Sequence, residues 1–114
     1  MIKSTIWLGN SLKQLKSFPE EVKDAMGFRL YMVQIGRMPY QAKPLKGIKP
    51  TVIEITCDHA GNTYRAVYTV KLGDTVYVLH CFQKKSKRGI ATPAQEIDMI
   101  KKRLKEAETL HKGE

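Results

Sequence analysis

Cysteine, acidic residues and long apolar runs are scarce in this 114-residue chain. Its two cysteines, Cys57 and Cys81, lie in strand-like runs without metal-ligand spacing, so we expect buried, reduced thiols rather than a disulfide. No apolar run is long enough to span a membrane, and residues 1–9 lack the apolar stretch of a signal peptide. No glycine-rich phosphate-binding loop, internal repeat or low-complexity tract is present. These absences argue against a membrane protein or a secreted disulfide scaffold and predict a cytoplasmic protein.

The shortage of acidic residues gives the chain a strong positive charge. Lysine and arginine number 20 against 11 aspartates and glutamates, for a formal net charge of +9. A small domain this basic usually binds a polyanion, most often nucleic acid, although excess lysine also serves solubility. Clustering favours the nucleic acid, because eight basic and only two acidic residues lie between positions 84 and 105. With 42% hydrophobic residues, the composition and length fit one globular domain over residues 1–114.

Apolar periodicity and turn residues predict an α+β domain with a small antiparallel sheet. A short strand over 3–8 is followed by two helices, over 11–16 and from Ser17 to about Ile35, which we expect to cover one face of the sheet. A strand over 51–57 and the two arms of a hairpin then form a meander, with the N-terminal strand added at an edge. A last helix begins at Thr92, and Ser17 and Thr92 both have the sequence context of N-terminal caps. The expected inward stripes of the two longer helices are Val22, Met26, Leu30 and Val33, widened by Ala25, Phe28 and Met32, and Ile97, Ile100, Leu104 and Ala107.

The hairpin over residues 64–86 is the stretch around which the chain is organised. Two runs rich in valine, tyrosine and threonine flank Gly73 and Asp74, which suit a two-residue turn. If Leu72 faces Thr75, the ladder pairs Tyr64 with Gln83, Arg65 with Phe82 and Tyr68 with Leu79. One face, with Tyr64, Ala66, Tyr68, Val70, Tyr77, Leu79 and Cys81, is then a core face. The other face carries Arg65, Val67, Thr69, Val76, Val78, His80, Phe82 and Lys84.

The second face of this hairpin has the chemistry of a nucleotide cradle. A guanidinium binds a phosphate through two hydrogen bonds, and the ring of Phe82 beside Arg65 offers a surface on which a base stacks. An amphipathic hairpin with a merely solvated polar face is the alternative interpretation. In the loop before the sheet, Lys43, Lys46 and Lys49 recur every third residue between prolines, a spacing that follows a phosphate backbone or, alternatively, places solvated lysines.

Four short motifs in a fixed order resemble one family of bacterial proteins. They are Lys-Pro-Leu-Lys-Gly at 43–47, Tyr-Arg-Ala-Val-Tyr at 64–68, Val-Leu-His-Cys-Phe-Gln-Lys-Lys-Ser at 78–86, and Thr-Pro at 92–93 with Glu-Ile at 96–97. Together they look like the RelE/HigB-type toxins of toxin–antitoxin pairs, in particular the phage-related Gp49-like branch. The resemblance runs from about residue 6 to residue 103, and the family's fold, helices on an antiparallel sheet, matches the expected order of elements.

The resemblance implies an endoribonuclease that cleaves mRNA, commonly on the ribosome, and that a helix-turn-helix antitoxin neutralises. Family chemistry needs no metal or other cofactor. The ribose 2′-hydroxyl attacks the adjacent phosphate and expels the 5′-oxygen, leaving a 2′,3′-cyclic phosphate or its hydrolysis product. Such a reaction requires cations at the phosphate, alignment of the hydroxyl and proton transfer at both oxygens.

Resemblance also implies roles for individual residues. Arg65 matches the arginine that family members place against the scissile phosphate. Lys84 or Lys85 matches the basic residue after the last strand, and Lys46 matches the lysine of the Pro-Leu-Lys turn. Phe82 lies where a base or ribose packs. The residues expected to hold flanking RNA are Lys43, Lys87, Arg88, Lys101 and Lys102.

The general base is open in this sequence. Some relatives carry a glutamate just before Pro-Leu-Lys, where this chain has Lys43, and some carry a lysine pair near the positions of Glu54 and Thr56. His80 is a candidate because the ladder places it on the Arg65 face, and a half-buried structural histidine is the equal alternative. A lysine with a pKa lowered by neighbouring cations is another.

Two further functions fit the same scaffold. ParE-like proteins resemble this fold but inhibit DNA gyrase without cleaving RNA, and in that case the basic face would dock on protein. The third hypothesis is an RNA-binding module that has lost its toxic activity. The Tyr-Arg and Lys-Lys-Ser motifs favour the nuclease.

Overall fold

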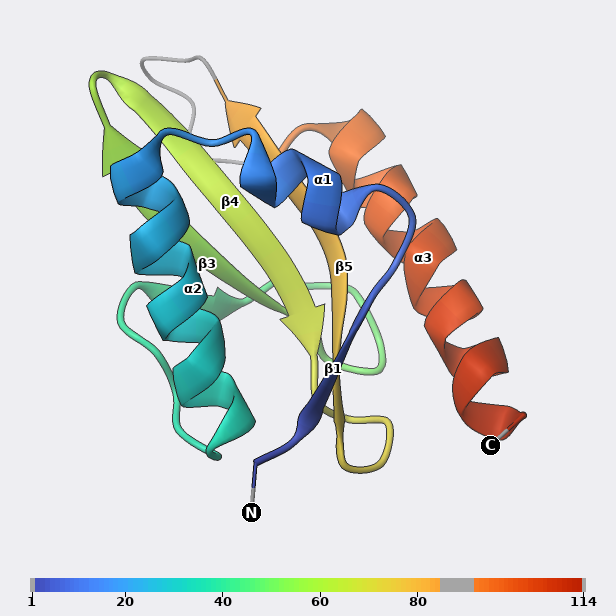
Figure 1. Cartoon of the computed structure of the whole chain (residues 1–114). Helices are drawn as coiled ribbons and strands as arrows, with labels where there is room; N and C mark the ends of the chain where they lie inside the picture. The colour runs from blue at the N-terminus through green and yellow to red at the C-terminus, as the bar shows by residue number, and fades with distance from the viewer. Residues whose placement is uncertain (1, 85–91, 114) are drawn as a thin grey trace.

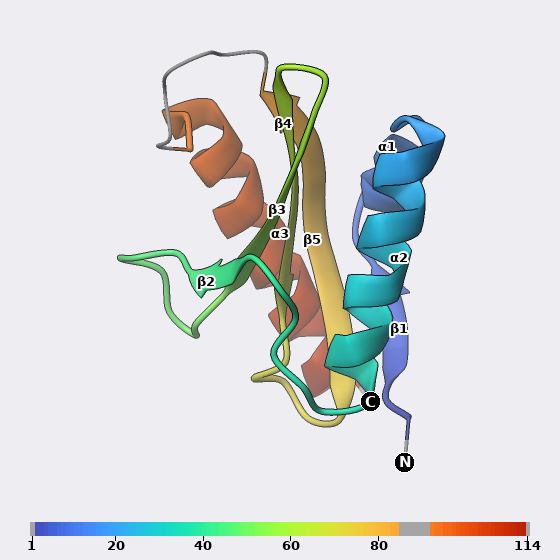
Figure 2. The same cartoon turned by 90° about the vertical axis from the view of Figure 1, so that its left-hand side faces the viewer.

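A five-stranded sheet lies between two layers of helix in the computed structural model, which describes residues 2–84 and 92–113 (Figure 1). Helices α1 and α2 cover one face of the sheet and α3 covers the other (Figure 2). The predicted α+β class is confirmed. The elements in chain order are β1 (Ser4–Trp7), α1 (Ser11–Lys16), α2 (Glu20–Gln34), β2 (Ala42–Pro44), β3 (Ile53–His59), β4 (Asn62–Thr69), β5 (Thr75–Lys84) and α3 (Ala94–Lys112).

The sheet has the strand order β1-β5-β4-β3-β2 and is mixed rather than purely antiparallel. Strand β1 lies at an edge, as predicted, but it pairs with β5 in parallel. The remaining pairs are antiparallel. The short strand β2 falls in the segment predicted as loop, where Pro44 faces Ile53. A proline is tolerated there because β2 is an edge strand and one side of it needs no ladder hydrogen bonds.

The predicted register of the central hairpin is confirmed for one half of the ladder. Thr63 pairs with Lys84, and Arg65 pairs with Phe82. Between Val67 and Tyr68 the register shifts by one residue, so Tyr68 pairs with Val78 instead of the predicted Leu79. The extra residue, Leu79, belongs to β5. Such a bulge moves the β5 side chains between it and the turn to the face opposite the one predicted.

The bulge corrects the faces predicted for β5. Tyr77 and Leu79 pack in the cluster under α3, whereas Val76 and Val78 pack in the cluster under α1 and α2. The predicted two-residue turn is also wrong, because five residues, 70–74, connect β4 to β5.

Both faces of the sheet are buried, so the expectation of one core face and one open polar face is wrong. The four predicted inward residues of α2 are buried, while Phe28 is 64% exposed and does not widen that stripe. The stripe predicted for the last helix packs on the opposite face: Ile100, Leu104 and Ala107 are buried and Ile97 is partly buried. Helix α3 therefore covers the face on which the nucleotide cradle was predicted.

The two predicted N-terminal caps are wrong. Helix α2 begins after Pro19 and α3 begins after Pro93, in both cases without a capping side-chain hydrogen bond. The Ser17 hydroxyl instead donates to the carbonyl of Gln14 at the end of α1. The Thr92 hydroxyl donates to the carboxylate of Glu54. Each hydroxyl therefore donates to another acceptor, a backbone carbonyl for Ser17 and a buried carboxylate for Thr92, and does not cap the helix.

Neither cysteine forms a disulfide, and Cys81 is buried while Cys57 is partly buried. Burial raises the pKa of the Cys81 thiol to about 12. Among the described residues, no helix is both long and apolar enough to cross a bilayer.

Candidate functional site

A row of four residues crosses the sheet on the face that α3 covers. Lys43 of β2 faces Glu54 of β3, Glu54 faces Val67 of β4, and Val67 faces His80 of β5. Facing residues in antiparallel strands point their side chains to the same face. Arg65 and Phe82 form the next pair along β4 and β5. The predicted neighbourhood of Arg65, Phe82 and His80 therefore exists, and Lys43 and Glu54 extend it across the sheet.

Glu54 and Arg65 form a buried ion pair. The Nη1 atom of Arg65 lies 2.7 Å from Oε1 of Glu54, and the Thr92 hydroxyl donates to Oε2 at 2.8 Å. Glu54 is 1% exposed and Arg65 is 4% exposed. The predicted open guanidinium is thus covered, and its charge is matched by a carboxylate. A buried arginine needs such a partner because desolvating an unpaired charge is very costly.

Glu54 is a residue to which the sequence analysis gave no role. It interrupts the apolar run at 52–55, and alternation places it on the same face as Val52 and Thr56. A carboxylate inside a buried strand requires a cation or several donors. The ladder between β3 and β4 places Arg65 next to Glu54 as the nearest cation of these two strands. The ion pair could therefore have been predicted from the sequence once the two strands were paired.

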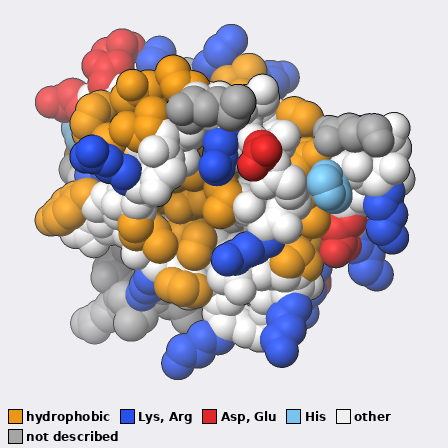
Figure 3. All heavy atoms as spheres, turned by 90° about the horizontal axis from the view of Figure 1, so that it is seen from below, with side chains coloured by type: hydrophobic (Ala, Val, Ile, Leu, Met, Phe, Trp, Pro, Cys, Tyr) orange, Lys and Arg blue, Asp and Glu red, His pale blue; other side chains and the backbone are white. Residues whose placement is uncertain are grey.

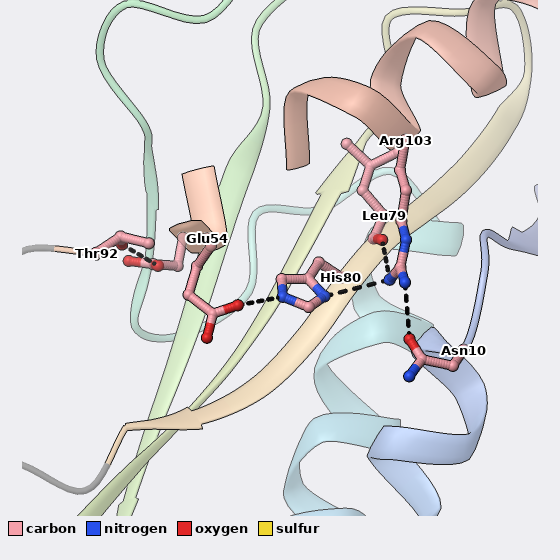
Figure 4. A network of polar contacts seen from close by, with 7 residues as sticks. Asn10, Glu54, Leu79, His80, Thr92 and Arg103 are labelled. Atoms are coloured by element: carbon pink, nitrogen blue, oxygen red, sulfur yellow. Dashed lines mark hydrogen bonds and ion pairs between the residues drawn. The ribbon is translucent and has the colours of Figure 1, made fainter. Parts of the chain in front are cut away.

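His80 joins a second polar network, which Figure 4 shows together with Asn10, Leu79 and Arg103. Its Nε2 atom lies 2.6 Å from Oε1 of Glu96, and its Nδ1 atom lies 3.2 Å from Nη1 of Arg103. A guanidinium only donates, so Nδ1 accepts and Nε2 carries the proton that goes to Glu96. Both ring nitrogens are engaged.

Burial lowers the pKa of His80 below its ordinary value, opposed by the hydrogen bond and charge of Glu96 and assisted by Arg103. The ring also stacks on Phe82, with centroids 4.9 Å apart. His80 is 8% exposed. This geometry fits a structural histidine, the alternative to a general base that the sequence analysis left open.

The remaining predicted cations lie in different places. Lys84 is partly buried at the end of β5, on the face of Phe82 by strand alternation, and it pairs with Thr63 in the ladder. Lys46 is exposed between β2 and β3, and Lys43 is exposed on β2. Lys101 and Lys102 are exposed on α3. Three predicted residues lie outside the described part of the chain, namely Lys85, Lys87 and Arg88.

A cleft of about 210 Å³ brings basic residues of two segments together. Lys49 from the loop before β3 lines it with Lys101 and Lys105 of α3, and Glu108 contributes the acidic group. The floor comes from Ile48 and Leu104, and both are buried. Of the three lysines, Lys101 was a predicted RNA contact and Lys49 belonged to the loop lysines whose spacing follows a phosphate backbone, whereas Lys105 had no predicted role. The charge of each segment was visible in the sequence, but the packing that joins the two segments was not.

No group of three or more histidine, cysteine, aspartate or glutamate side chains is arranged as a metal site within residues 2–84 and 92–113. Residues 13–105, most of the chain, match the family described as phage derived protein Gp49-like (DUF891). The chain belongs to the Gp49-like family. Gp49-like proteins are a family of RelE-like toxins, so the resemblance seen in the four motifs is confirmed at the level of the family. No curated protein matches the chain.

Membership in the Gp49-like family suggests that the chain is the toxin of a toxin–antitoxin pair, with an antitoxin as partner. In this Gp49-like protein the polar groups divide into a buried part and an exposed part. The buried part connects α3, and Thr92 just before it, to the sheet. The exposed part consists of lysines on β2, the following loop and α3.

Proposed function

We propose that this Gp49-like toxin is a metal-independent endoribonuclease that cleaves mRNA, on the ribosome, by attack of the 2′-hydroxyl on the adjacent phosphate. In the proposal it acts in the cytoplasm and a helix-turn-helix antitoxin neutralises it. One observation carries the proposal. The register of β4 and β5 gathers Arg65, Phe82 and Lys84 on one face, where Arg65 and Phe82 are buried under α3 and Lys84 is partly buried. The two cations suit a phosphate, whereas the predicted packing of a base on Phe82 is not open in the free protein, because that ring is 6% exposed and stacks on His80.

The roles of the cations follow from their exposure. Lys84 and the exposed Lys46 are proposed to contact the phosphate oxygens as charge builds on them, together with Lys85. Arg65 contacts RNA only if a phosphate replaces Glu54 as its partner. A phosphate can take the place of the carboxylate because both groups accept two parallel hydrogen bonds from a guanidinium. Lys49, Lys101 and Lys105 are proposed to bind flanking phosphates, with Lys43, Lys87, Arg88 and Lys102.

Proton transfer falls to a different group from His80. Both nitrogens of its ring are engaged, with Glu96 and with Arg103. A lysine of the exposed set is therefore the proposed acid–base group, acting with a pKa that neighbouring cations lower when RNA brings them together.

A second candidate function is inhibition of DNA gyrase without RNA cleavage, as ParE-like proteins do. The observation that favours it is the burial of Arg65, whose charge Glu54 already neutralises in the free protein. On this alternative the exposed lysines of α3 would contact protein.

The test is cleavage of a defined mRNA by the purified chain in EDTA, with and without ribosomes. The proposal predicts new RNA ends in EDTA, with the rate reduced by about 10²-fold or more in Lys84→Ala and in Lys46→Ala. Lys13→Ala, a charge loss on α1 and on the opposite face of the sheet from α3, should cleave like the wild type. Intact mRNA together with inhibited DNA supercoiling would replace the proposal with the gyrase alternative.

A further inference from the structure

A groove with an apolar floor lies at the end of the sheet near the start of β1 and the end of α2. Figure 3 shows this end of the molecule, where a hollowed hydrophobic area is bordered by lysine and arginine side chains. The groove has a volume of about 520 Å³. Its apolar lining consists of Val33, Met38, Ile53, Tyr68 and Val70. Its cationic lining consists of Lys3, Arg37 and Lys71.

A second groove, of about 360 Å³, adjoins the first along the outer side of α2, and Met38 lines both. Phe28, Arg29 and Tyr40 also line it. Phe28 is 64% exposed, Met38 is 63% exposed and Tyr40 is 72% exposed. Arg29 is held in place, since it donates to the carbonyl of Thr56 at 2.7 Å and lies over the Tyr40 ring.

Large apolar side chains left in water next to one another mark a surface that another molecule covers. This surface lies on the α2 side of the sheet, whereas the lysine cleft described above lies on the α3 side. A partner bound here leaves that cleft accessible. The surface is therefore separate from the proposed RNA contacts.

We propose that the two adjoining grooves are a docking surface for a segment of the antitoxin in which apolar side chains alternate with carboxylates. This inference rests on the proposed function, because the occupant is the partner of a toxin. Charge complementarity selects the occupant: the described lining of the two grooves supplies Lys3, Arg29, Arg37 and Lys71 and no aspartate or glutamate. A second copy of this chain would bring the same cations to the surface. RNA would leave the aliphatic floor of Val33, Ile53 and Val70 without a matching partner.

The probe is a pair of fluorescein-labelled peptides of equal length with the same apolar residues, one carrying glutamates and the other carrying lysines at the alternate positions. Fluorescence anisotropy with the full chain should show that the glutamate peptide binds about tenfold or more tightly than the lysine peptide. Met38→Glu places a carboxylate at the junction of the grooves and should weaken binding of the glutamate peptide about tenfold. Arg37→Glu, on the exposed rim, should do the same.

Leu110→Glu is the matched control, because Leu110 is an apolar residue of α3 that is 48% exposed. It should bind the glutamate peptide like the wild type. The proposal is overturned if the two peptides bind equally, if Leu110→Glu weakens binding as much as Met38→Glu, or if an RNA oligonucleotide displaces the peptide. It is also overturned if sedimentation shows a dimer that Met38→Glu dissociates.

RNA cleavage is measured on the same variants to separate this inference from the proposed function. Met38→Glu and Arg37→Glu should retain wild-type cleavage. Selective peptide binding without cleavage by any variant would contradict the endoribonuclease and leave the docking surface standing.

Discussion

Arg65 and Glu54 show how much a single buried pair constrains this molecule. Two charges removed from water are expensive, and they are tolerated here because each is the other's hydrogen-bond partner at 2.7 Å. Removing one of them leaves the other buried alone. Replacing both with apolar residues of similar size removes the desolvation cost as well as the attraction.

Arg65→Ala should therefore lower the free energy of unfolding by about 3 kcal/mol, measured by urea denaturation. The double variant Glu54→Leu/Arg65→Met should recover most of that loss. If Arg65 also binds the phosphate, the recovered protein should fold but not cleave RNA. An unchanged unfolding free energy for Arg65→Ala would mean that the pair contributes nothing to the folded state.

His80 gives the protein a predicted pH dependence. Burial lowers its pKa in the folded state below the ordinary 6.5, so the unfolded chain binds the proton more readily. The contribution of neutral His80 to stability is complete above pH 6.5 and is lost as the pH falls from there toward the folded pKa.

Thermal unfolding between pH 7.5 and pH 5.5 tests this sign. The wild type should lose stability on acidification, and His80→Gln, which keeps a donor and an acceptor but does not titrate, should lose less. Equal losses in both proteins would show that other groups dominate this pH range.

Single residues also show where sequence reasoning reached its limit. The pairing of Arg65 with Phe82 followed from the spacing of one hairpin and is confirmed. The burial of Arg65 depends on α3 folding back from residues that are distant in sequence, and the hairpin pattern holds no information about that packing. Glu54 was visible as a charge in an apolar strand and needed only its partner to be identified.

At the scale of elements, Arg103 is a polar side chain that connects α3 to two other elements. Its guanidinium donates to the carbonyl of Leu79 on β5 at 3.1 Å and to Oδ1 of Asn10 at 2.8 Å, just before α1. It also contacts His80. One buried residue thereby joins α3, β5 and the start of α1.

Gly9 makes room for this junction. Its φ is +54°, and a Cβ there would lie 2.6 Å from the Arg103 guanidinium. Gly9→Ala should lose about 1–2 kcal/mol for the backbone conformation and about 1–3 kcal/mol more for the clash. Gly61→Ala is the control, because Gly61 has a φ of +82° and nothing within 4 Å of the added Cβ. Urea denaturation should show a larger loss for Gly9→Ala, and equal losses would mean that Arg103 moves aside at no cost.

The element order was largely predictable from sequence, because apolar stripes and turn residues mark α1, α2, α3 and the central hairpin. Two features were not. The bulge, opposite Val67 and Tyr68, inserts one residue into β5, and no glycine or proline in that strand indicates its position. It reverses the faces of Tyr77 and Leu79. Strand β2 is three residues long and contains Pro44, so its local pattern is that of a loop.

At the scale of the whole molecule, the net charge of +9 is distributed around a sheet covered on both faces. The lysine cleft on the α3 side is the part of that charge proposed to bind RNA. Binding to a single-stranded RNA should weaken with salt in proportion to the number of phosphate contacts. Removing two contacting lysines should reduce both the affinity and the salt dependence.

Lys101→Ala/Lys105→Ala should therefore reduce the slope of log affinity against log salt by about 1.4, at about 0.7 per contact for single strands. Lys13→Ala/Lys16→Ala removes the same charge from α1 and should leave the slope unchanged. Fluorescence anisotropy with a labelled oligonucleotide measures both. An equal change of slope in the two double variants would show that RNA affinity depends only on the net charge and that the cleft is not a binding site.

The family, and with it the class of toxin, was predictable from sequence because four short motifs occur together in the order and spacing typical of that family. The central claim beyond the family is RNA cleavage. Its most direct measurement is a map of the 5′ ends of cellular transcripts after brief expression of the wild type and of Lys84→Ala. The account predicts new internal 5′-hydroxyl ends in mRNA for the wild type and their loss in the variant, and growth arrest with intact transcripts and broken DNA would contradict it.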